Sequence, residues 1–175
     1  MLKQADITSA RLDAELILAN TLRKNRTYLH AHLDEEIDPR RVDIAEARLS
    51  LRLDRVPLAY ILGKKEFYGR EFDVSPNVLV PRPESEEMIN MLLKLAPQGN
   101  QPRTLIDVGT GSGCLGITAA LELPDNWHIV LSDISSKALS VAEKNAKKLG
   151  AKVFTQKQSL LLGQFEKLDC ILANL

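Results

Sequence analysis

The spacing of apolar residues divides the chain near residue 75. Before residue 75, apolar residues recur at the spacing of an α-helix in four segments, residues 9–24, 27–33, 39–55 and 56–63. The Asp38-Pro39 pair marks a helix start, because a capping acid is followed by proline at the first helical position. A hairpin is predicted next, since β-type residues flank Gly69. Residues 1–75 are therefore expected to form a small helical domain that ends in a hairpin.

From residue 76 onward, short apolar runs alternate with amphipathic helical segments. Strands are predicted at residues 104–108, 129–133, 152–155 and 168–173. Helices are predicted at residues 84–96, 115–120 and 136–149. This alternation is typical of a parallel, doubly wound α/β sheet. Residues 76–175 are therefore expected to form a second domain of the α/β class.

A glycine-rich stretch, Asp107-Val-Gly-Thr-Gly-Ser-Gly113, follows the first of these strands. Glycine lets the backbone turn tightly and approach a ligand closely, because it has no Cβ. The next helix begins directly afterwards and directs its first N–H groups back at the loop. A strand, a glycine loop and a helix N-terminus together are the unit with which α/β sheets hold a nucleotide.

Three interpretations of this loop compete. The segment from Gly111 to Gly116 matches the dinucleotide pattern G-x-G-x-x-G, which alone is a weak signal. Asp107 favours a cationic ligand such as S-adenosylmethionine, whose sulfonium and amino groups it would attract, whereas a pyrophosphate would be repelled. A glycine-rich turn without any ligand is the third interpretation.

Asp133 ends the next predicted strand and has the position of a ribose-binding acid. A carboxylate about 20 residues beyond such a loop can accept hydrogen bonds from both ribose hydroxyls. The alternative is that Asp133 caps the following helix, but Ser135 is better placed for that role.

Charge and composition argue against several kinds of binding partner, namely nucleic acid, a membrane and a metal ion. The formal net charge is zero, so no global field attracts nucleic acid or an anionic membrane. No apolar run approaches the roughly 18 residues that suggest a membrane span, and the N-terminus lacks the apolar core of a signal peptide. Cys114 and Cys170 lack metal-ligand spacing, so we expect free thiols in a cytoplasmic protein and no metal site.

Four arginines, Arg41, Arg48, Arg52 and Arg55, fall close together on one face of the helix predicted at residues 39–55. Two interpretations of this arginine stripe stay open. It is either a solvated helix face or a surface that binds a partner.

Five motifs in a fixed order carry a resemblance that extends over the whole chain. They are Arg11-Leu-Asp-Ala-Glu-Leu16, Pro57-Leu-Ala-Tyr-Ile-Leu-Gly63, Glu66-Phe-Tyr-Gly69, Val80-Pro-Arg-Pro-Glu-Ser-Glu86 and Asp107-Val-Gly-Thr-Gly-Ser-Gly113. Together they resemble the HemK/PrmC family of release-factor glutamine methyltransferases. The Pro-Arg-Pro-Glu element differs from its counterpart in the related ribosomal-protein glutamine methyltransferases.

The resemblance implies methyl transfer from S-adenosylmethionine to the glutamine side-chain amide in the Gly-Gly-Gln loop of peptide-chain release factors. It implies a helical N-terminal domain that recognises the release factor and a Rossmann-like methyltransferase sheet, of which residues 76–175 would supply the first half. Asn174 matches the first residue of the family's Asn-Pro-Pro-Tyr motif, so it is the expected catalytic and substrate-binding residue. The expected cofactor-binding residues are Asp107, Gly109, Thr110, Gly111, Ser112, Gly113, Asp133, Leu161 and Asn174.

The chain departs from the family pattern in two places. Leu175 stands where the Asn-Pro-Pro-Tyr motif has its first proline, and Leu160 stands where the family usually has an acid near the adenine. We therefore expect the chain to be the N-terminal part of a longer enzyme and to lack methylation activity by itself. A non-catalytic module that binds S-adenosylmethionine or a release factor is the alternative. An adenine-N6 methyltransferase of nucleic acid is a weaker one, because the net charge and the Pro-Arg-Pro-Glu element argue against it.

Overall fold

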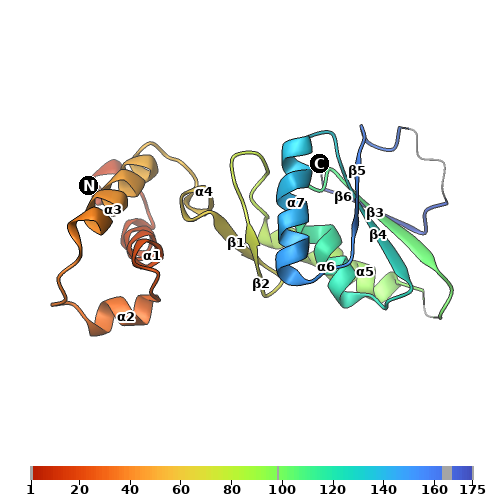
Figure 1. The fold of residues 1–175 in the computed structure, drawn as a ribbon, viewed down its shortest axis with the longest axis horizontal. Coiled ribbons are helices and arrows are strands. Elements are labelled where there is room, and N and C mark those ends of the chain that lie inside the picture. The colour runs from red at the N-terminus through yellow and green to blue at the C-terminus, as the bar shows by residue number, and fades with distance from the viewer. Residues whose placement is uncertain (1, 98, 163–166, 175) are drawn as a thin grey trace. The chain divides into compact units, whose positions relative to one another are not determined.

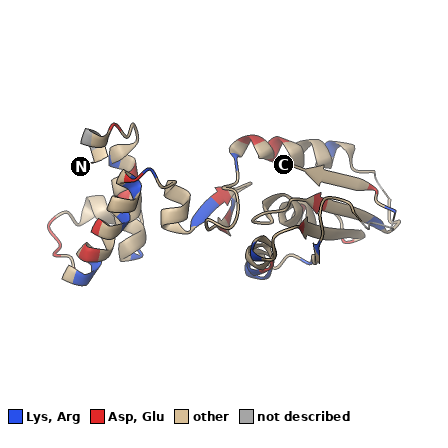
Figure 2. Ribbon diagram, turned by 90° about the horizontal axis from the view of Figure 1, so that it is seen from above, with Lys and Arg blue, Asp and Glu red and all other residues tan. Residues whose placement is uncertain are grey.

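A computed structural model describes residues 2–97, 99–162 and 167–174. The chain divides into two compact units, Met1–Gly63 and Lys64–Leu175 (Figure 1). In the described part of the chain, no helix combines the length and the apolar character needed to cross a membrane. Acidic and basic positions are interspersed along the helices of the first unit, which agrees with the balanced charge of the sequence (Figure 2).

The first unit is helical. Its elements are the 3-10 helix η1 (Leu2–Ala5) and the α-helices α1 (Ala10–Leu22), α2 (Arg26–Ala31), α3 (Pro39–Leu53) and α4 (Leu58–Leu62). The predicted start at Asp38-Pro39 is confirmed, since the Asp38 side chain accepts a hydrogen bond from the Arg40 N–H. Asn25 caps α2 in the same way by accepting from the Tyr28 N–H.

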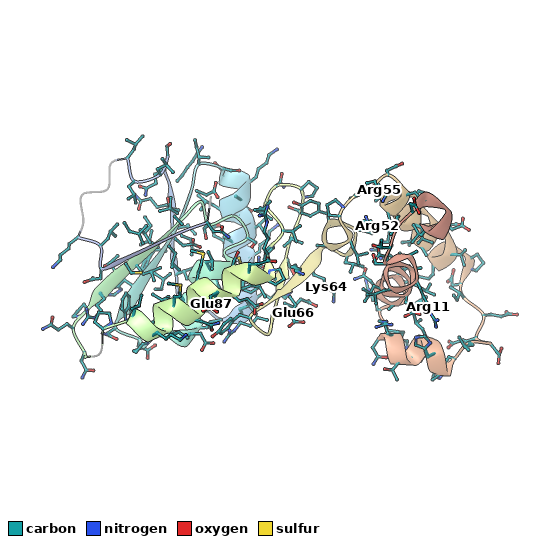
Figure 3. The ribbon with its side chains drawn as sticks, turned by 180° about the vertical axis from the view of Figure 1, so that it is seen from behind. Arg11, Arg52, Arg55, Lys64, Glu66 and Glu87 are labelled. Carbon is teal, nitrogen blue, oxygen red and sulfur yellow. The ribbon has the colours of Figure 1, made fainter. Side chains whose placement is uncertain are left out.

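The arginine stripe of α3 is part of the framework of this unit. Arg52 forms an ion pair with Asp13 of α1, with 2.7 Å between Nε and Oδ2, and the Asp13 side chain is only 4% exposed. Arg48 donates to the Asn20 side chain and to the Thr21 hydroxyl, at 2.8 and 2.9 Å. Figure 3 labels Arg52 on this helix and Arg55, which lies just beyond its C-terminal end.

Backbone carbonyls accept from the other two arginines. Arg41 donates to the Thr21 carbonyl at 2.8 Å, and Arg55 donates to the Ala5 carbonyl at 2.6 Å. The solvated-face interpretation is therefore wrong for Arg41, Arg48 and Arg52, whereas binding of a partner by the stripe stays a prediction. The guanidinium groups join α3 to α1 and η1, where unpaired polar groups would otherwise cost free energy.

The second unit is built on a parallel sheet. It contains the strands β1 (Lys64–Phe67), β2 (Arg70–Asp73), β3 (Arg103–Val108), β4 (Trp127–Asp133), β5 (Phe154–Lys157) and β6 (Cys170–Ala173). Its helices are η2 (Pro83–Ser85), α5 (Glu86–Leu95), α6 (Cys114–Glu122) and α7 (Ser136–Leu149). The sheet order is β5-β4-β3-β6, with every pair parallel, and β1 and β2 form a separate antiparallel hairpin. This is the predicted α/β, Rossmann-like architecture.

The hairpin belongs to the second unit. Phe67 and Phe72 are buried, meet edge to face with 6.2 Å between ring centroids, and lie in the same core cluster as Ile89 and Leu105. The boundary therefore falls after Gly63, whereas residue 75 was expected from the sequence. The aromatic rings of this short hairpin find their apolar partners in the core that follows them in the chain.

The strand predicted at residues 152–155 begins later, at Phe154, and pairs from Val130↔Phe154 to Asp133↔Lys157. Its start is delayed because the end of α7 uses the preceding residues. Gly150 adopts a φ of 72°, and the Ala151 N–H donates to the Ala146 carbonyl.

Candidate functional site

The carboxyl ends of three neighbouring strands bring the predicted site residues to one edge of the sheet. Val108, the last residue of β3, pairs with Ser132 of β4 and with Ala173 of β6. The glycine loop, Asp133 and Asn174 are the residues that follow these three positions. In open α/β sheets this edge is the usual place for a ligand.

The backbone of the glycine loop adopts angles that favour glycine. Gly109, Gly111 and Gly113 have φ angles of 69°, 55° and 83°, in the left-handed region that side chains disfavour. A Cβ on Gly113 would also lie 2.5 Å from Cδ1 of Ile117. The loop is closed by a hydrogen bond from the Gly113 N–H to the Thr110 carbonyl at 2.8 Å.

Asp107 holds this loop from inside the protein. It is 1% exposed, and its Oδ2 accepts from the Thr110 hydroxyl at 2.6 Å and from the Gly116 N–H at 2.9 Å. Burial raises the pKa of Asp107 to about 6, the two hydrogen bonds oppose that rise, and the nearby Asp133 charge adds to it. Asp107 thus joins the strand end to the start of α6.

Thr110 and Ser112, two further residues expected to bind cofactor, have buried side chains. The Thr110 N–H donates to the Ser132 carbonyl at 2.9 Å, and the Ser112 carbonyl accepts from the Asn145 side chain at 2.8 Å. Their main-chain bonds fix the shape of the loop.

Asp133 connects the end of β4 to the glycine loop. Its Oδ2 accepts from the Gly111 N–H at 3.0 Å, and its Oδ1 accepts from the Ser135 N–H at 2.8 Å. Ser135 caps α7 through its own hydroxyl, which accepts from the Ala138 N–H, so the predicted assignment of that cap is confirmed. Each Asp133 oxygen keeps a second lone pair, and the side chain is half-buried.

Asn174 directly follows β6 and is held by a residue far away in the sequence. Its Nδ2 donates to the Ser85 hydroxyl at 2.7 Å, and Ser85 is 6% exposed. Ser85 belongs to the Pro-Arg-Pro-Glu-Ser segment, which the sequence marked as a family motif without giving it a role. Leu175, the next residue, lies outside the described part of the chain.

The loop after β5 contains Leu160, which departs from the family pattern, and Leu161, an expected cofactor-binding residue. The Gln158 N–H donates to the Asp133 carbonyl at 3.2 Å, which ties the start of this loop to the end of β4. Leu160 has a φ of 51° and is 55% exposed, and Leu161 is 38% exposed. A leucine at positive φ carries strain that Asp or Asn tolerates better.

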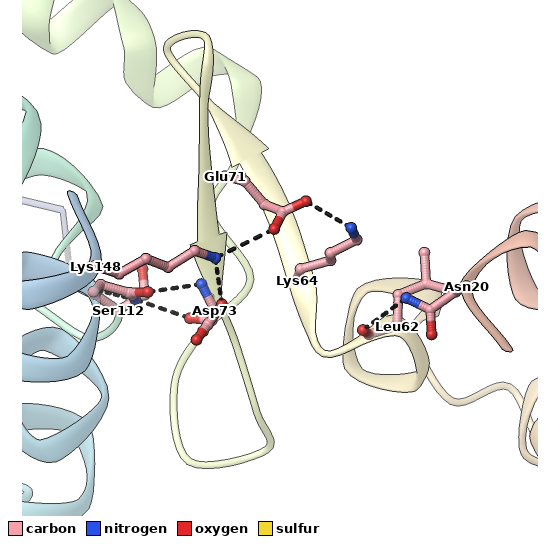
Figure 4. Close-up of polar contacts among 8 residues, drawn as sticks. Asn20, Leu62, Lys64, Glu71, Asp73, Ser112 and Lys148 are labelled. Carbon is pink, nitrogen blue, oxygen red and sulfur yellow. Dashed lines mark hydrogen bonds and ion pairs between the residues drawn. The ribbon is translucent and has the colours of Figure 1, made fainter. Parts of the chain in front are cut away.

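Sequence reasoning missed Asn145, which joins the hairpin to the glycine loop. This side chain of α7 is fully buried and accepts from the Asp73 N–H at 2.7 Å. Its Nδ2 donates to the Asp73 and Ser112 carbonyls at 2.9 and 2.8 Å. Lys148 adds ion pairs to Glu71 and Asp73 (Figure 4). A polar residue among the small apolar residues on the inner face of α7 was the available signal.

Two family models match separate parts of the chain. Residues 1–63 match the PrmC N-terminal domain, and residues 100–175 match a methyltransferase domain. Two curated relatives carry the name release factor glutamine methyltransferase. The protein of Koribacter versatilis is 42% identical over 99% of this chain and 62% of its own length. The protein of Leptospira interrogans is 41% identical over 83% of this chain and 50% of its own length. The chain thus spans about half to three-fifths of these relatives.

A solved structure shares the fold. The Pyrococcus abyssi tRNA (uracil-54, C5)-methyltransferase, solved in complex with S-adenosyl-L-homocysteine, matches 62% of this chain and 26% of its own chain. The TM-score is 0.50 and the sequence identity is 14%. At that identity the likeness concerns the fold alone.

Proposed function

The chain belongs to the HemK/PrmC family by sequence, and we propose that it serves methyl transfer from S-adenosylmethionine to a glutamine side-chain amide of a peptide-chain release factor. One observation carries the proposal: the Asn174 side chain, the glycine loop and Asp133 lie at one edge of the sheet. A group that orients an amide is thereby placed next to a loop built for close approach of a nucleotide.

The residues present fit S-adenosylmethionine. The positive φ angles of the loop glycines leave its backbone open to a ligand, and Asp133 has free lone pairs for a ribose diol. Asp107 and Asp133 together make the edge negative, which favours a sulfonium and an amino group over a pyrophosphate. This charge argues against the dinucleotide interpretation.

The chemistry assigned to Asn174 is orientation. An amide nitrogen is a poor nucleophile, because its lone pair is delocalised into the carbonyl. The Asn174 Oδ1 is available to accept an N–H of the acceptor glutamine and to aim its nitrogen at the methyl group that the cofactor supplies. S-adenosylmethionine, when bound, would supply the methyl group and leave as the thioether, and the methylated nitrogen would then give its proton to solvent. Positioning and electrostatics then account for most of the rate enhancement.

We assign the choice of protein substrate to the first unit. Residues 1–63 match the PrmC N-terminal domain, and the relatives' names specify a release factor. A release factor works in translation, so we place the reaction in the cytoplasm.

Mass spectrometry of a release factor tests this proposal. The full-length product of the gene is incubated with S-adenosylmethionine and a release factor, and the Gly-Gly-Gln peptide is analysed. We expect one added methyl group on the glutamine. Asn174→Ala should lower the rate by roughly 100-fold or more. A parent protein that binds S-adenosylmethionine and leaves the glutamine unmodified would favour the binding-module alternative.

A further inference from the structure

The hydrogen bond between Asn174 and Ser85 joins residues 89 positions apart in the sequence. Within the described residues, Nδ2 of Asn174 donates to the Ser85 hydroxyl at 2.7 Å, and no hydrogen bond to Oδ1 of Asn174 is found. A carboxamide carries its donors and its acceptor on opposite branches, so fixing Nδ2 also fixes where Oδ1 points.

Ser85 is a rigid partner for this contact. Its N–H donates to the Arg82 carbonyl at 3.1 Å, and Pro83 limits the backbone at the start of η2. The Ser85 hydroxyl makes no capping bond to α5, although Ser85 precedes that helix, so it stays available to Asn174.

The next residue fastens this turn to the core of the second unit. Glu86 accepts a hydrogen bond from the Tyr68 N–H of the hairpin at 2.9 Å. One turn further along α5, Ile89 is fully buried. The Ser85 hydroxyl therefore has little freedom to follow a moving partner.

We propose that Ser85 is a positioning residue that anchors the Asn174 carboxamide through its amino group, as the structure shows it, and so leaves Oδ1 turned toward the acceptor amide. The inference rests on the proposed function, because it assigns to Oδ1 the acceptance of a glutamine N–H. With the carboxamide turned over, its NH₂ would face the NH₂ of the substrate, and two donors do not bind each other. The Pro-Arg-Pro-Glu-Ser segment thereby gains a role in orienting the acceptor amide.

Nuclear magnetic resonance on the 175-residue chain tests the contact without any need for activity. The side-chain amide signals of Asn174 are assigned by their loss in Asn174→Asp. In Ser85→Ala these protons should exchange with water roughly tenfold faster, as expected when one hydrogen bond is lost. Ser85→Thr keeps a hydroxyl and should be parent-like. Ser50→Ala removes an exposed hydroxyl of α3 and serves as the matched control.

Kinetics on the full-length gene product test the consequence. Ser85→Ala should lower kcat for release-factor methylation by roughly 10- to 100-fold while KM for S-adenosylmethionine stays parent-like, and Ser85→Thr should restore kcat. A merely structural role would change thermal stability or cofactor affinity without this selective loss of kcat.

The two arms separate the possible failures. Parent-like exchange of the Asn174 amide in Ser85→Ala would overturn the positioning role of Ser85, whatever the enzyme does. An intact contact in a parent protein that does not methylate glutamine would overturn the proposed function, and this inference with it. An active parent together with a fully active Ser85→Ala would overturn the role of Ser85 alone.

Discussion

Replacing Asp107 by asparagine should change how the stability of the chain depends on pH. The Asp107 side chain is 1% exposed, and burial raises its pKa from the ordinary value of 3.8 to about 6. Its Oδ2 binds the Thr110 hydroxyl and the Gly116 N–H, and the side-chain oxygen of an asparagine can accept both of these bonds. The Asp107→Asn variant would therefore preserve the loop contacts and remove the buried charge.

The direction of this pH dependence follows from how many protons the folded and unfolded chains bind. Between about pH 4 and pH 6 the folded chain retains a proton on Asp107 that the unfolded chain has lost, so the parent loses stability as pH rises through this window. A pKa difference of about two units corresponds to about 3 kcal/mol. The unfolding free energy of Asp107→Asn minus that of the parent should therefore increase by about 3 kcal/mol from about pH 4 to about pH 7.5.

Urea denaturation of the parent and Asp107→Asn at a series of pH values measures this difference. Titrating groups that do not interact with Asp107 contribute equally to both proteins and cancel in the subtraction. A constant difference between the two proteins across this pH range would refute the account of Asp107 as a buried carboxylate. A stability difference that decreases with rising pH would contradict the predicted direction of the pKa shift of Asp107.

Two further predictions concern the polar contacts inside each unit. Asn145→Leu should cost about 3 kcal/mol of unfolding free energy or more and weaken cofactor binding, because the fully buried Asn145 side chain makes three hydrogen bonds that hold the hairpin and the glycine loop. Lys148→Met, on the exposed side of the same helix, should cost about 1 kcal/mol or less in the same urea titration. Arg52→Met should destabilise the first unit by about 3 kcal/mol, because it leaves the buried Asp13 carboxylate without its cation, and limited proteolysis of residues 1–63 should accelerate while cofactor affinity is unchanged. Slow proteolysis of Arg52→Met would return this arginine to the solvated-face interpretation.

Features that depend on neighbouring residues in the sequence were predicted well. The cap at Asp38, the hairpin around Gly69 and the turn at Gly109–Gly113 are set by local backbone preferences, and the structure has each of them. The position of Asp133 at a strand end also follows from local pattern. Its contact with a ribose stays a prediction.

Contacts between distant segments could not be predicted in this way. The ion pair of Arg52 with Asp13 and the bond between Asn174 and Ser85 each depend on how two elements pack. A stripe of arginines has the same spacing whether it faces solvent or a neighbouring helix, so the pattern could not tell these environments apart. The hairpin was assigned to the first unit for the same reason, since sequence order does not show which core buries Phe67.

Calorimetric titration of the 175-residue chain with S-adenosylmethionine tests the central claim most directly. The account predicts binding by the parent and a loss of roughly 10- to 150-fold in affinity for Asp133→Ala, which loses a charged acceptor for the ribose and the bond to the Gly111 N–H. NAD should give no binding heat. Binding of NAD in place of S-adenosylmethionine, or an S-adenosylmethionine affinity unchanged by Asp133→Ala, would contradict the assignment of this sheet edge as the cofactor site.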